Sequence, residues 1–302
     1  MYKYIFGPVQ SRRFGLSLGI DLSPDEKSCN FDCLYCELSK AKVTDTIKNS
    51  PKVSDVIDEV KKALQEYPLI DVITITANGE PTLYLELDTL VDQLNLIKGD
   101  KKLLILSNSS TISDENIRKT VSKIDIVKLS LDCVSTRCFR RIDRALSGID
   151  VLHIIEGLKK FRKIFDKEMV IEILIVSGVN DNPKEMKLLN EVLGEIKPNR
   201  IDIGSVDRPP AYPVEAVDSD WIQSLSREFV DLPVCLIYKQ EPKERLYFSK
   251  DEILQTIKRR PQSQDDIKYL FDEKSQENLK RLVEDGEVSV KNIAGVEFFT
   301  LP

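Results

Sequence analysis

The chain has 302 residues, of which 41% are hydrophobic and 31% are charged, and its net charge at pH 7 is −6. The apolar fraction is large enough for a folded core, which excludes disorder over most of the chain. No stretch approaches the roughly 20 apolar residues that span a bilayer, and the N-terminal residues are too polar for a signal peptide. We therefore expect a soluble, cytoplasmic protein whose contacts to nucleic acid, if it makes any, come from a local basic patch.

The first 240 residues alternate between strand patterns and amphipathic helix patterns. Strands are predicted within 13–22 and at 71–76, 103–106, 124–131, 169–176 and 200–203. Helices are predicted at 53–67, 85–97, 149–165, 183–195 and 218–230, with another after the third strand that Ser113 can cap. Strands separated by helices indicate βαβ units and a parallel sheet. Six units are too few for a closed eight-stranded barrel, so the predicted fold is α/β, a partial (β/α)6 barrel of the TIM type, with a doubly wound sheet as the alternative.

The composition changes after Tyr238. Residues 239–244 are polar, contain Pro242 and are predicted to form a linker. The last part of the chain has three short helical patterns, at 250–258, 263–271 and 275–285, and then a hairpin of 288–290 and 296–301. Three helices followed by a hairpin describe a winged helix-turn-helix. We predict two domains, the partial barrel over 1–240 and a winged-helix-like domain over 249–302.

Three of the six cysteines, Cys29, Cys33 and Cys36, follow the first predicted strand with the spacing C-x3-C-x2-C. This cysteine motif can bind three irons of a [4Fe–4S] cube and leave the fourth iron open to a ligand that is not protein. A structural zinc site needs four protein ligands, and the only histidine, His153, lies more than 100 residues away. The spacing therefore favours an iron–sulfur cluster over a zinc-stabilised scaffold.

The cysteine motif, with the aromatic Tyr35 before its last cysteine, resembles the signature of the radical S-adenosylmethionine (SAM) superfamily. The segment 7–21 is similar to the lead-in of a subgroup that includes wyosine-type tRNA-modifying enzymes, although Gln10 stands where a second proline is usual. The resemblance covers residues 3 to about 240. It implies a [4Fe–4S] cluster and SAM as cofactors, Tyr35 near SAM, and an electron donor such as flavodoxin or ferredoxin.

The segment 76–82, TANGEPT, ends the second predicted strand and is similar to the Gly-Gly-Glu-Pro motif of the same superfamily. The resemblance implies that Gly79, Glu80 and Pro81 form the site for the amino group of SAM. Carbonyl and carboxylate oxygens accept hydrogen bonds from an ammonium group, and glycine allows close approach. The alternative is an ordinary turn at the end of a strand.

Polar residues also follow three later strands. The resemblance implies that Ser107, Asn108 and Ser130 meet the carboxylate or ribose of SAM, because α/β barrels place their sites at the C-terminal ends of the strands. Arg208 follows the sixth strand and is predicted to contact the substrate or the SAM carboxylate. Strand-end capping and an ordinary surface arginine are the alternatives.

The densest basic run comprises Arg137, Arg140, Arg141 and Arg144, which a helix would place on one broad face. Arg140 and Arg141 are therefore candidate contacts to a phosphate of the substrate, although a solvated helix face explains the pattern equally well. Residues 249–302 hold 9 basic and 11 acidic residues. The terminal domain is therefore as suited to a protein or peptide partner as to nucleic acid.

The leading hypothesis is a radical SAM enzyme that cleaves SAM to a 5′-deoxyadenosyl radical, which abstracts hydrogen from a substrate, with tRNA slightly ahead of a peptide or protein. A hypothesis of another class is an iron–sulfur redox-sensing regulator with a winged-helix binding module. The remaining cysteines lack a tight spacing and are expected to be buried structural residues without disulfides; these are Cys133, Cys138 and Cys235.

Overall fold

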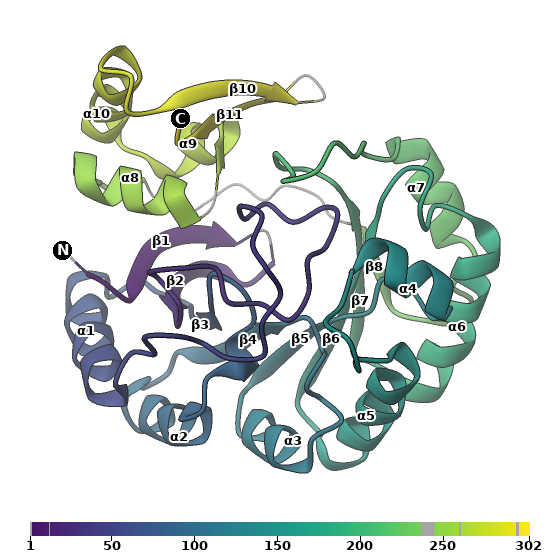
Figure 1. Cartoon of the computed structure of the whole chain (residues 1–302). Coiled ribbons are helices and arrows are strands. Elements are labelled where there is room, and N and C mark those ends of the chain that lie inside the picture. Colours follow the sequence, from purple (N-terminus) through teal and green to yellow (C-terminus); the bar gives the residue numbers. More distant parts are fainter. Residues whose placement is uncertain (1, 12, 237–244, 260, 294–295) are drawn as a thin grey trace.

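The computed structural model describes residues 2–11, 13–236, 245–259, 261–293 and 296–302. An eight-stranded sheet with helices around it is followed by a smaller group of helices and strands (Figure 1). The predicted linker, 239–244, lies outside the described residues. Within those residues, no helix combines the length and the apolar character that crossing a bilayer requires.

The large sheet has the strand order β1 to β8. β1 pairs with β2 antiparallel, and each later strand pairs in parallel with the next one. The strands are β1 (Ile5–Ser11), β2 (Gly15–Asp21), β3 (Val72–Thr76), β4 (Lys102–Ser107), β5 (Ile126–Ser130), β6 (Glu168–Ile175), β7 (Arg200–Ser205) and β8 (Val234–Leu236). This is the predicted α/β fold with a parallel sheet.

The helices lie along the outer side of the curved sheet, as Figure 1 shows. They are α1 (Val53–Glu66), α2 (Leu87–Ile97), α3 (Glu115–Ser122), α4 (Thr136–Ile142), α5 (Val151–Ile164), α6 (Pro183–Ile196) and α7 (Ser219–Ser226). The predicted cap of α3 is wrong by one residue. Asp114, not Ser113, precedes α3, and its carboxylate accepts hydrogen bonds from the N–H groups of Asn116 and Ile117.

Two strands of the sheet were not predicted from the sequence. β1 contains Gly7 and Pro8, residues that argue against a strand, and only an edge position such as this one tolerates them. β8 has three residues, which is too short for a hydrophobic pattern to stand out. The six predicted strands correspond to β2 through β7.

Alternate residues of the parallel strands face opposite sides of the sheet. Leu103, Ile105 and Val127 are fully buried in the main hydrophobic core. Their neighbours Leu104 and Lys128 face the interior cavity instead. This period of two separates an apolar layer under the helices from a partly polar interior, and the interior is where a ligand can bind.

The C-terminal part of the chain has a hydrophobic core of its own. It contains α8 (Lys250–Arg259), β9 (Gln262–Ser263), α9 (Gln264–Leu270), α10 (Glu273–Glu284), β10 (Ser289–Ile293) and β11 (Val296–Thr300). The three strands form a sheet in the order β10–β11–β9. The predicted helices and hairpin are therefore present. Figure 1 shows this region beside β1, which α8 and α9 contact.

Candidate active site

The cysteine motif lies on the loop between β2 and α1, and its three cysteines are free thiols. Hydrogen-bond donors face two of the sulfurs. Lys27 Nζ lies 3.2 Å from the Sγ of Cys36, while the N–H of Phe31 and the side-chain amide of Asn108 lie 3.4 and 3.6 Å from the Sγ of Cys29. Such donors stabilise thiolates. Burial raises the pKa of Cys29 to about 12, and binding of a metal to this sulfur would release the proton.

This donor set fits the expected cluster. Three thiols on one loop, with an ammonium group and amide groups around them, match the ligands and the hydrogen bonds that an iron–sulfur cluster requires. The loop is also anchored to α4, because the N–H groups of Asp32 and Leu34 donate to the carbonyls of Asp143 and Ile142, at 3.0 and 2.9 Å.

Gly79 packs directly against the backbone of the cysteine loop. The N–H of Ser28 donates to the carbonyl of Asn78 at 2.8 Å, and the N–H of Glu80 donates to the carbonyl of Ser28 at 3.0 Å. Gly79 has φ +139°, and a Cβ added there would lie 1.8 Å from the Ser28 oxygen. The sequence predicted that this glycine allows SAM to approach. In the structure the group that approaches it is the backbone of Ser28, next to the first cysteine.

Glu80 is buried, with 1% of its surface exposed. One carboxylate oxygen accepts hydrogen bonds from the N–H and hydroxyl of Thr82 and from the hydroxyl of Ser107, and the other accepts one from the N–H of Asn108. Burial raises the pKa of Glu80, and these hydrogen bonds oppose that shift. The carboxylate predicted to bind an ammonium group thus joins the ends of β3 and β4, and Pro81 begins a short 3-10 helix beside it.

Tyr35 is tied to the end of the fourth parallel strand, β5. Its hydroxyl donates to Asp132 at 2.5 Å, and the same carboxyl group accepts from the N–H of Leu174 at 2.7 Å. Burial is the main cause that raises the pKa of Asp132. Ser130 lies at the end of β5, where its carbonyl accepts a hydrogen bond from the hydroxyl of Ser109. Sequence reasoning missed Asp132, although a carboxylate directly after a strand was the available signal.

A cavity of about 490 Å³ lies inside the barrel. This volume is within the range of small-molecule pockets, roughly 300–1,000 Å³. The structure brings most of the sequence-predicted residues to its wall: Tyr35, Cys36, Gly79, Glu80, Ser107, Asn108, Ser130 and Arg208. Four groups of predicted residues are not among its lining: Cys29, Cys33, Pro81 and the arginines of α4.

Arg208 has other partners than those predicted. Its side chain is buried, donates to the carbonyl of Pro261, and lies 3.3 Å from carboxylate oxygens of both Asp266 and Glu37. It therefore connects the end of β7 to the C-terminal region and to the residue that follows the cysteine motif. The sequence could not indicate this contact, because Asp266 is 58 residues away.

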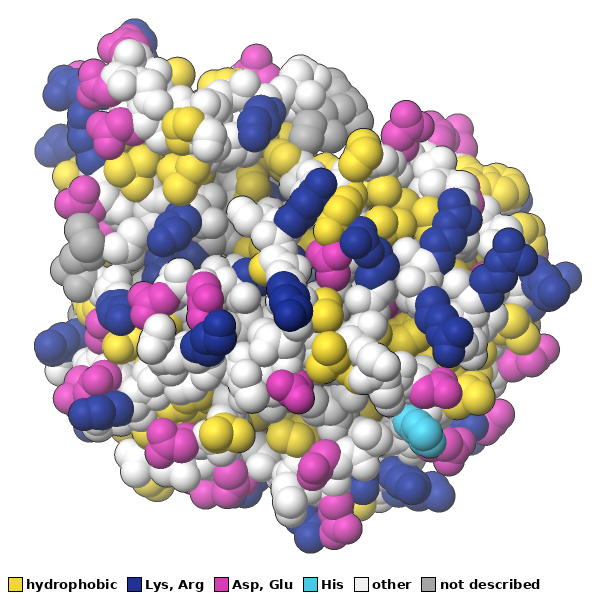
Figure 2. All heavy atoms as spheres, in the orientation of Figure 1, with side chains coloured by type: hydrophobic (Ala, Val, Ile, Leu, Met, Phe, Trp, Pro, Cys, Tyr) yellow, Lys and Arg dark blue, Asp and Glu magenta, His cyan; other side chains and the backbone are white. Residues whose placement is uncertain are grey.

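The basic run lies on and beside α4. Arg137, Arg140 and Arg141 are exposed on this helix. Arg144 lies after its end, pairs with Asp32 at 2.8 Å and stacks on the ring of Tyr212. Figure 2 shows Lys and Arg side chains gathered over this side of the molecule. Three of the four arginines therefore lie on one helix, as predicted, and Arg144 lies beyond its end.

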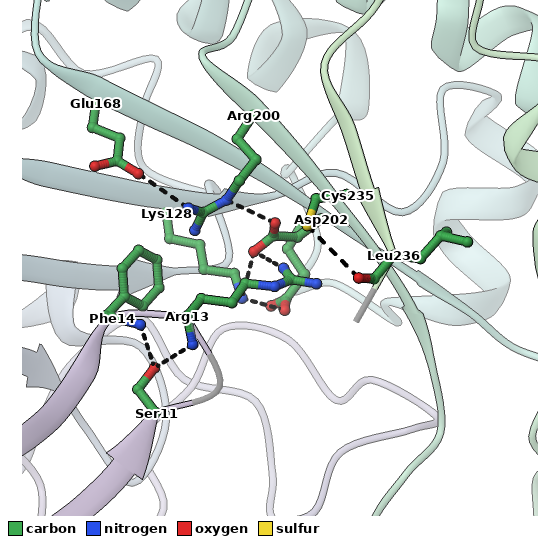
Figure 3. A network of polar contacts seen from close by, with 10 residues as sticks. Ser11, Arg13, Phe14, Lys128, Glu168, Arg200, Asp202, Cys235 and Leu236 are labelled. Atoms are coloured by element: carbon green, nitrogen blue, oxygen red, sulfur yellow. Dashed lines mark hydrogen bonds and ion pairs between the residues drawn. The ribbon is translucent and has the colours of Figure 1, made fainter. Parts of the chain in front are cut away.

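Arg13, Lys128 and Glu172 line one part of the cavity, here called its floor, and belong to a network of charged side chains (Figure 3). Arg13, from the turn between β1 and β2, forms an ion pair with Asp202 of β7, and Arg200 donates to the same carboxylate at 2.9 Å. Lys128 of β5 bonds Glu172 of β6 and lies 3.5 Å from Asp202, which has no exposed surface. Barrel interiors are usually filled by branched apolar side chains, and buried charges are costly. Such a network indicates a functional interior.

Sequence reasoning missed this network. The signal was present, because Lys128, Glu172 and Asp202 each interrupt an apolar strand. Which face each residue occupies depends on the register of the strands. Arg13 joins the others from the turn between β1 and β2, far from β7 in the sequence.

The other cysteines differ in part from expectation. Cys133 and Cys138 form a disulfide, with their Cα atoms 5.8 Å apart, whereas the sequence predicted unpaired cysteines. The turn from β5 into α4, which the side chain of Ser135 caps, brings the two together at a distance that allows this bond. Cys235 is a half-buried free thiol, and His153 is exposed on α5.

The family model of the radical SAM superfamily matches residues 27–189. The chain belongs to the radical SAM superfamily. It is therefore an enzyme whose cofactors are a [4Fe–4S] cluster and SAM. When bound, these cofactors supply a one-electron cleavage of SAM to methionine and a 5′-deoxyadenosyl radical. The chain offers three free thiols on one loop and a cavity lined by polar residues at the ends of the strands.

Among curated proteins, the chain is 37% identical over 298 residues to a UPF0026 protein of Helicobacter pylori, with 98% of this chain and 96% of that protein covered. It is 32% identical over 210 residues to a UPF0026 protein of Methanocaldococcus jannaschii, with 68% and 64% covered. Among solved structures, Streptococcus suis SuiB bound to SAM aligns with a TM-score of 0.55 at 16% identity, over 74% of this chain and 50% of that one. The structural likeness shows the fold alone.

Proposed function

We propose that this enzyme abstracts hydrogen from a group that a macromolecule inserts into the barrel cavity, and that the macromolecule is RNA, as in the wyosine-type tRNA-modifying subgroup. The observation that carries the proposal is the position of α4. Its C-terminal end is hydrogen-bonded to the cysteine loop, and the exposed Arg140 and Arg141 lie in the last turn before that end. A phosphate bound to Arg140 and Arg141 would therefore sit next to the cluster.

The cavity supports the same proposal. SAM must occupy much of its 490 Å³, which leaves space for a projecting group rather than for a folded substrate. At its floor, the Lys128 ammonium group is a donor and the Glu172 carboxylate is an acceptor, so together they suit a polar group with both kinds of hydrogen-bonding atom. We assign to these two residues the contact with the inserted group.

For the C-terminal region we propose a winged-helix module over 249–302, attached to a barrel domain over 1–240. The order of helices and strands, with β10 and β11 as the wing, supports this assignment. In α10, Lys280 and Arg281 pair with Glu284 and Glu277 of the same helix. Since these pairs involve two of the three basic residues of α10, and the helix also carries three glutamates, a helix in a DNA groove is disfavoured. A cytoplasmic donor of the flavodoxin or ferredoxin type would supply the electron.

The double variant Arg140→Ala/Arg141→Ala is expected to bind bulk tRNA more weakly than the wild type. Two lost phosphate contacts should also flatten the dependence of log K on log salt by roughly 1.4 to 1.8. Fluorescence anisotropy of labelled tRNA with the anaerobically prepared holoprotein measures both quantities. Lys61→Ala/Lys62→Ala, which removes two exposed cations from α1, is the matched control. Wild-type protein that binds no tRNA at low salt would contradict the RNA proposal and favour a peptide.

Lys128→Met is expected to abolish modification of the RNA while leaving the cleavage of SAM intact. Wild-type enzyme incubated with tRNA, SAM and a reductant should yield a modified nucleoside, detected by mass spectrometry after digestion. The variant should lose that product, because its cavity floor no longer offers the ammonium group, yet it should still form 5′-deoxyadenosine from SAM without RNA. Equal nucleoside yields from the variant and the wild type would remove the assignment of Lys128.

A further inference from the structure

One side chain of the C-terminal region reaches the wall of the SAM cavity. Arg259, the last residue of α8, has 11% of its side chain exposed and lines the cavity. Its Nε donates to Asp21 at 3.1 Å, and one terminal nitrogen donates to the carbonyl of Lys3 at 2.7 Å. The guanidinium also lies 5.4 Å from the ring centroid of Phe6. These partners hold it in one orientation.

Asp21 connects this arginine to the strand end that faces SAM. It is the last residue of β2 and is almost fully buried. Its second carboxylate oxygen accepts hydrogen bonds from the N–H groups of Asn78 and Ser23, at 2.8 and 3.0 Å. Asn78 directly precedes Gly79, which packs on the cysteine loop. One carboxylate thus holds the 78–79 turn on one side and Arg259 on the other.

Without Arg259, Asp21 would be a buried charge with no cationic partner among the residues that the structure describes. A buried carboxylate in that state either takes up a proton or turns toward water. Either response weakens the acceptor that fixes the N–H of Asn78. The position of the 78–79 turn therefore depends on whether α8 is docked on the barrel.

A second contact also connects the C-terminal region to the wall of the cavity. Arg208 of the barrel lies between Asp266 of α9 and Glu37, the residue after the last motif cysteine. The C-terminal region is thus connected to the 78–79 turn through Asp21, and to the end of the cysteine loop through Arg208. Two arginines make these contacts, one from each side of the interface: Arg208 is buried and Arg259 is half-buried.

We propose that Arg259 is a positioning residue for SAM: through Asp21 it sets the geometry of the 78–79 turn, so that docking of the C-terminal region controls the affinity of the barrel for SAM. The inference rests on SAM binding and does not depend on the RNA substrate. It gives the C-terminal region a task within the reaction besides any binding of a partner.

The test measures the SAM dissociation constant of the full-length, cluster-loaded protein by anaerobic equilibrium dialysis. Arg259→Gln should raise this constant at least about fivefold, the lower range of measured couplings between sites, while iron content stays at the wild-type level. Arg259→Lys should restore part of the affinity, because an ammonium group can pair with Asp21 but cannot make the guanidinium's several contacts. Arg281→Gln, which breaks an exposed ion pair within α10, is the control and should leave SAM binding unchanged.

Asp21→Asn keeps the proposal testable if Arg259→Gln is unstable, and where both single variants fold, the double variant completes a double-mutant cycle. An asparagine retains an acceptor for Asn78 but loses the ion pair, so this variant should also weaken SAM binding. The double variant should bind SAM as tightly as the single variant with the lower affinity. Three results would each overturn the coupling. In the first, the increases of the SAM dissociation constant in the two single variants multiply in the double variant. In the second, Arg259→Gln leaves this constant unchanged, and in the third, Arg281→Gln raises it as much as Arg259→Gln does. Wild-type protein that holds iron but binds no SAM would overturn the coupling and the cofactor assignment together.

Discussion

An alanine at any one of the three motif cysteines is expected to release the cluster. Two thiolates cannot hold a [4Fe–4S] cube that already has an iron without a protein ligand. Iron per chain after anaerobic reconstitution should fall from about four to near zero, with loss of the visible charge-transfer absorbance. Cys235→Ala removes a half-buried free thiol outside the motif and is the matched control, which should keep full iron. A motif variant that retains the iron of the wild type would contradict the ligand assignment.

Gly79→Ala is expected to have the second largest effect, on both cofactors at once. The new Cβ would lie 1.8 Å from the Ser28 oxygen, so the 78–79 turn and the cysteine loop must move apart. We expect a loss of about 3 kcal/mol or more in stability, the upper end for overpacking, together with reduced iron content and SAM binding. Thermal unfolding, iron analysis and equilibrium dialysis measure these three quantities.

Gly99→Ala separates the clash from backbone strain. Gly99 also has a positive φ, +60°, but a Cβ there meets nothing within 4 Å. Its substitution should cost only about 1 kcal/mol, the strain of a left-handed alanine, and leave both cofactors bound. If the two alanine variants behaved alike, the close approach of Ser28 would not be the reason for glycine at position 79.

The sequence predicted the parts of the fold that local pattern determines. Strands such as 71–76 and helices such as 183–195 have apolar residues at regular intervals, a pattern that is visible in the sequence itself. The parallel sheet follows from the alternation of these strands and helices. β1 could not be predicted, because Gly7 and Pro8 are unfavourable in strands and the pairing of β1 with β2 depends on the rest of the sheet. Local pattern therefore finds long elements and misses short or edge ones.

The candidate site divides in the same way. The cysteine motif is defined by spacing along the chain, so it could be recognised without knowledge of the fold. Partners far apart in the chain could not be found, such as Arg259 with Asp21 or Arg13 with Asp202, because long-range contacts leave no spacing signal in one sequence. Glu80 shows the intermediate case, since its place was predicted while its hydrogen-bond partners on β4 were not.

The most direct test of the central claim is the cleavage of SAM by the reconstituted protein. The full-length chain, loaded anaerobically with iron and sulfide and reduced with dithionite, is incubated with SAM, and 5′-deoxyadenosine and methionine are quantified by chromatography and mass spectrometry. We predict that both products form in equal amounts and that the Cys33→Ala variant forms neither. Protein that carries about four irons per chain, binds SAM and still forms no 5′-deoxyadenosine would contradict the account.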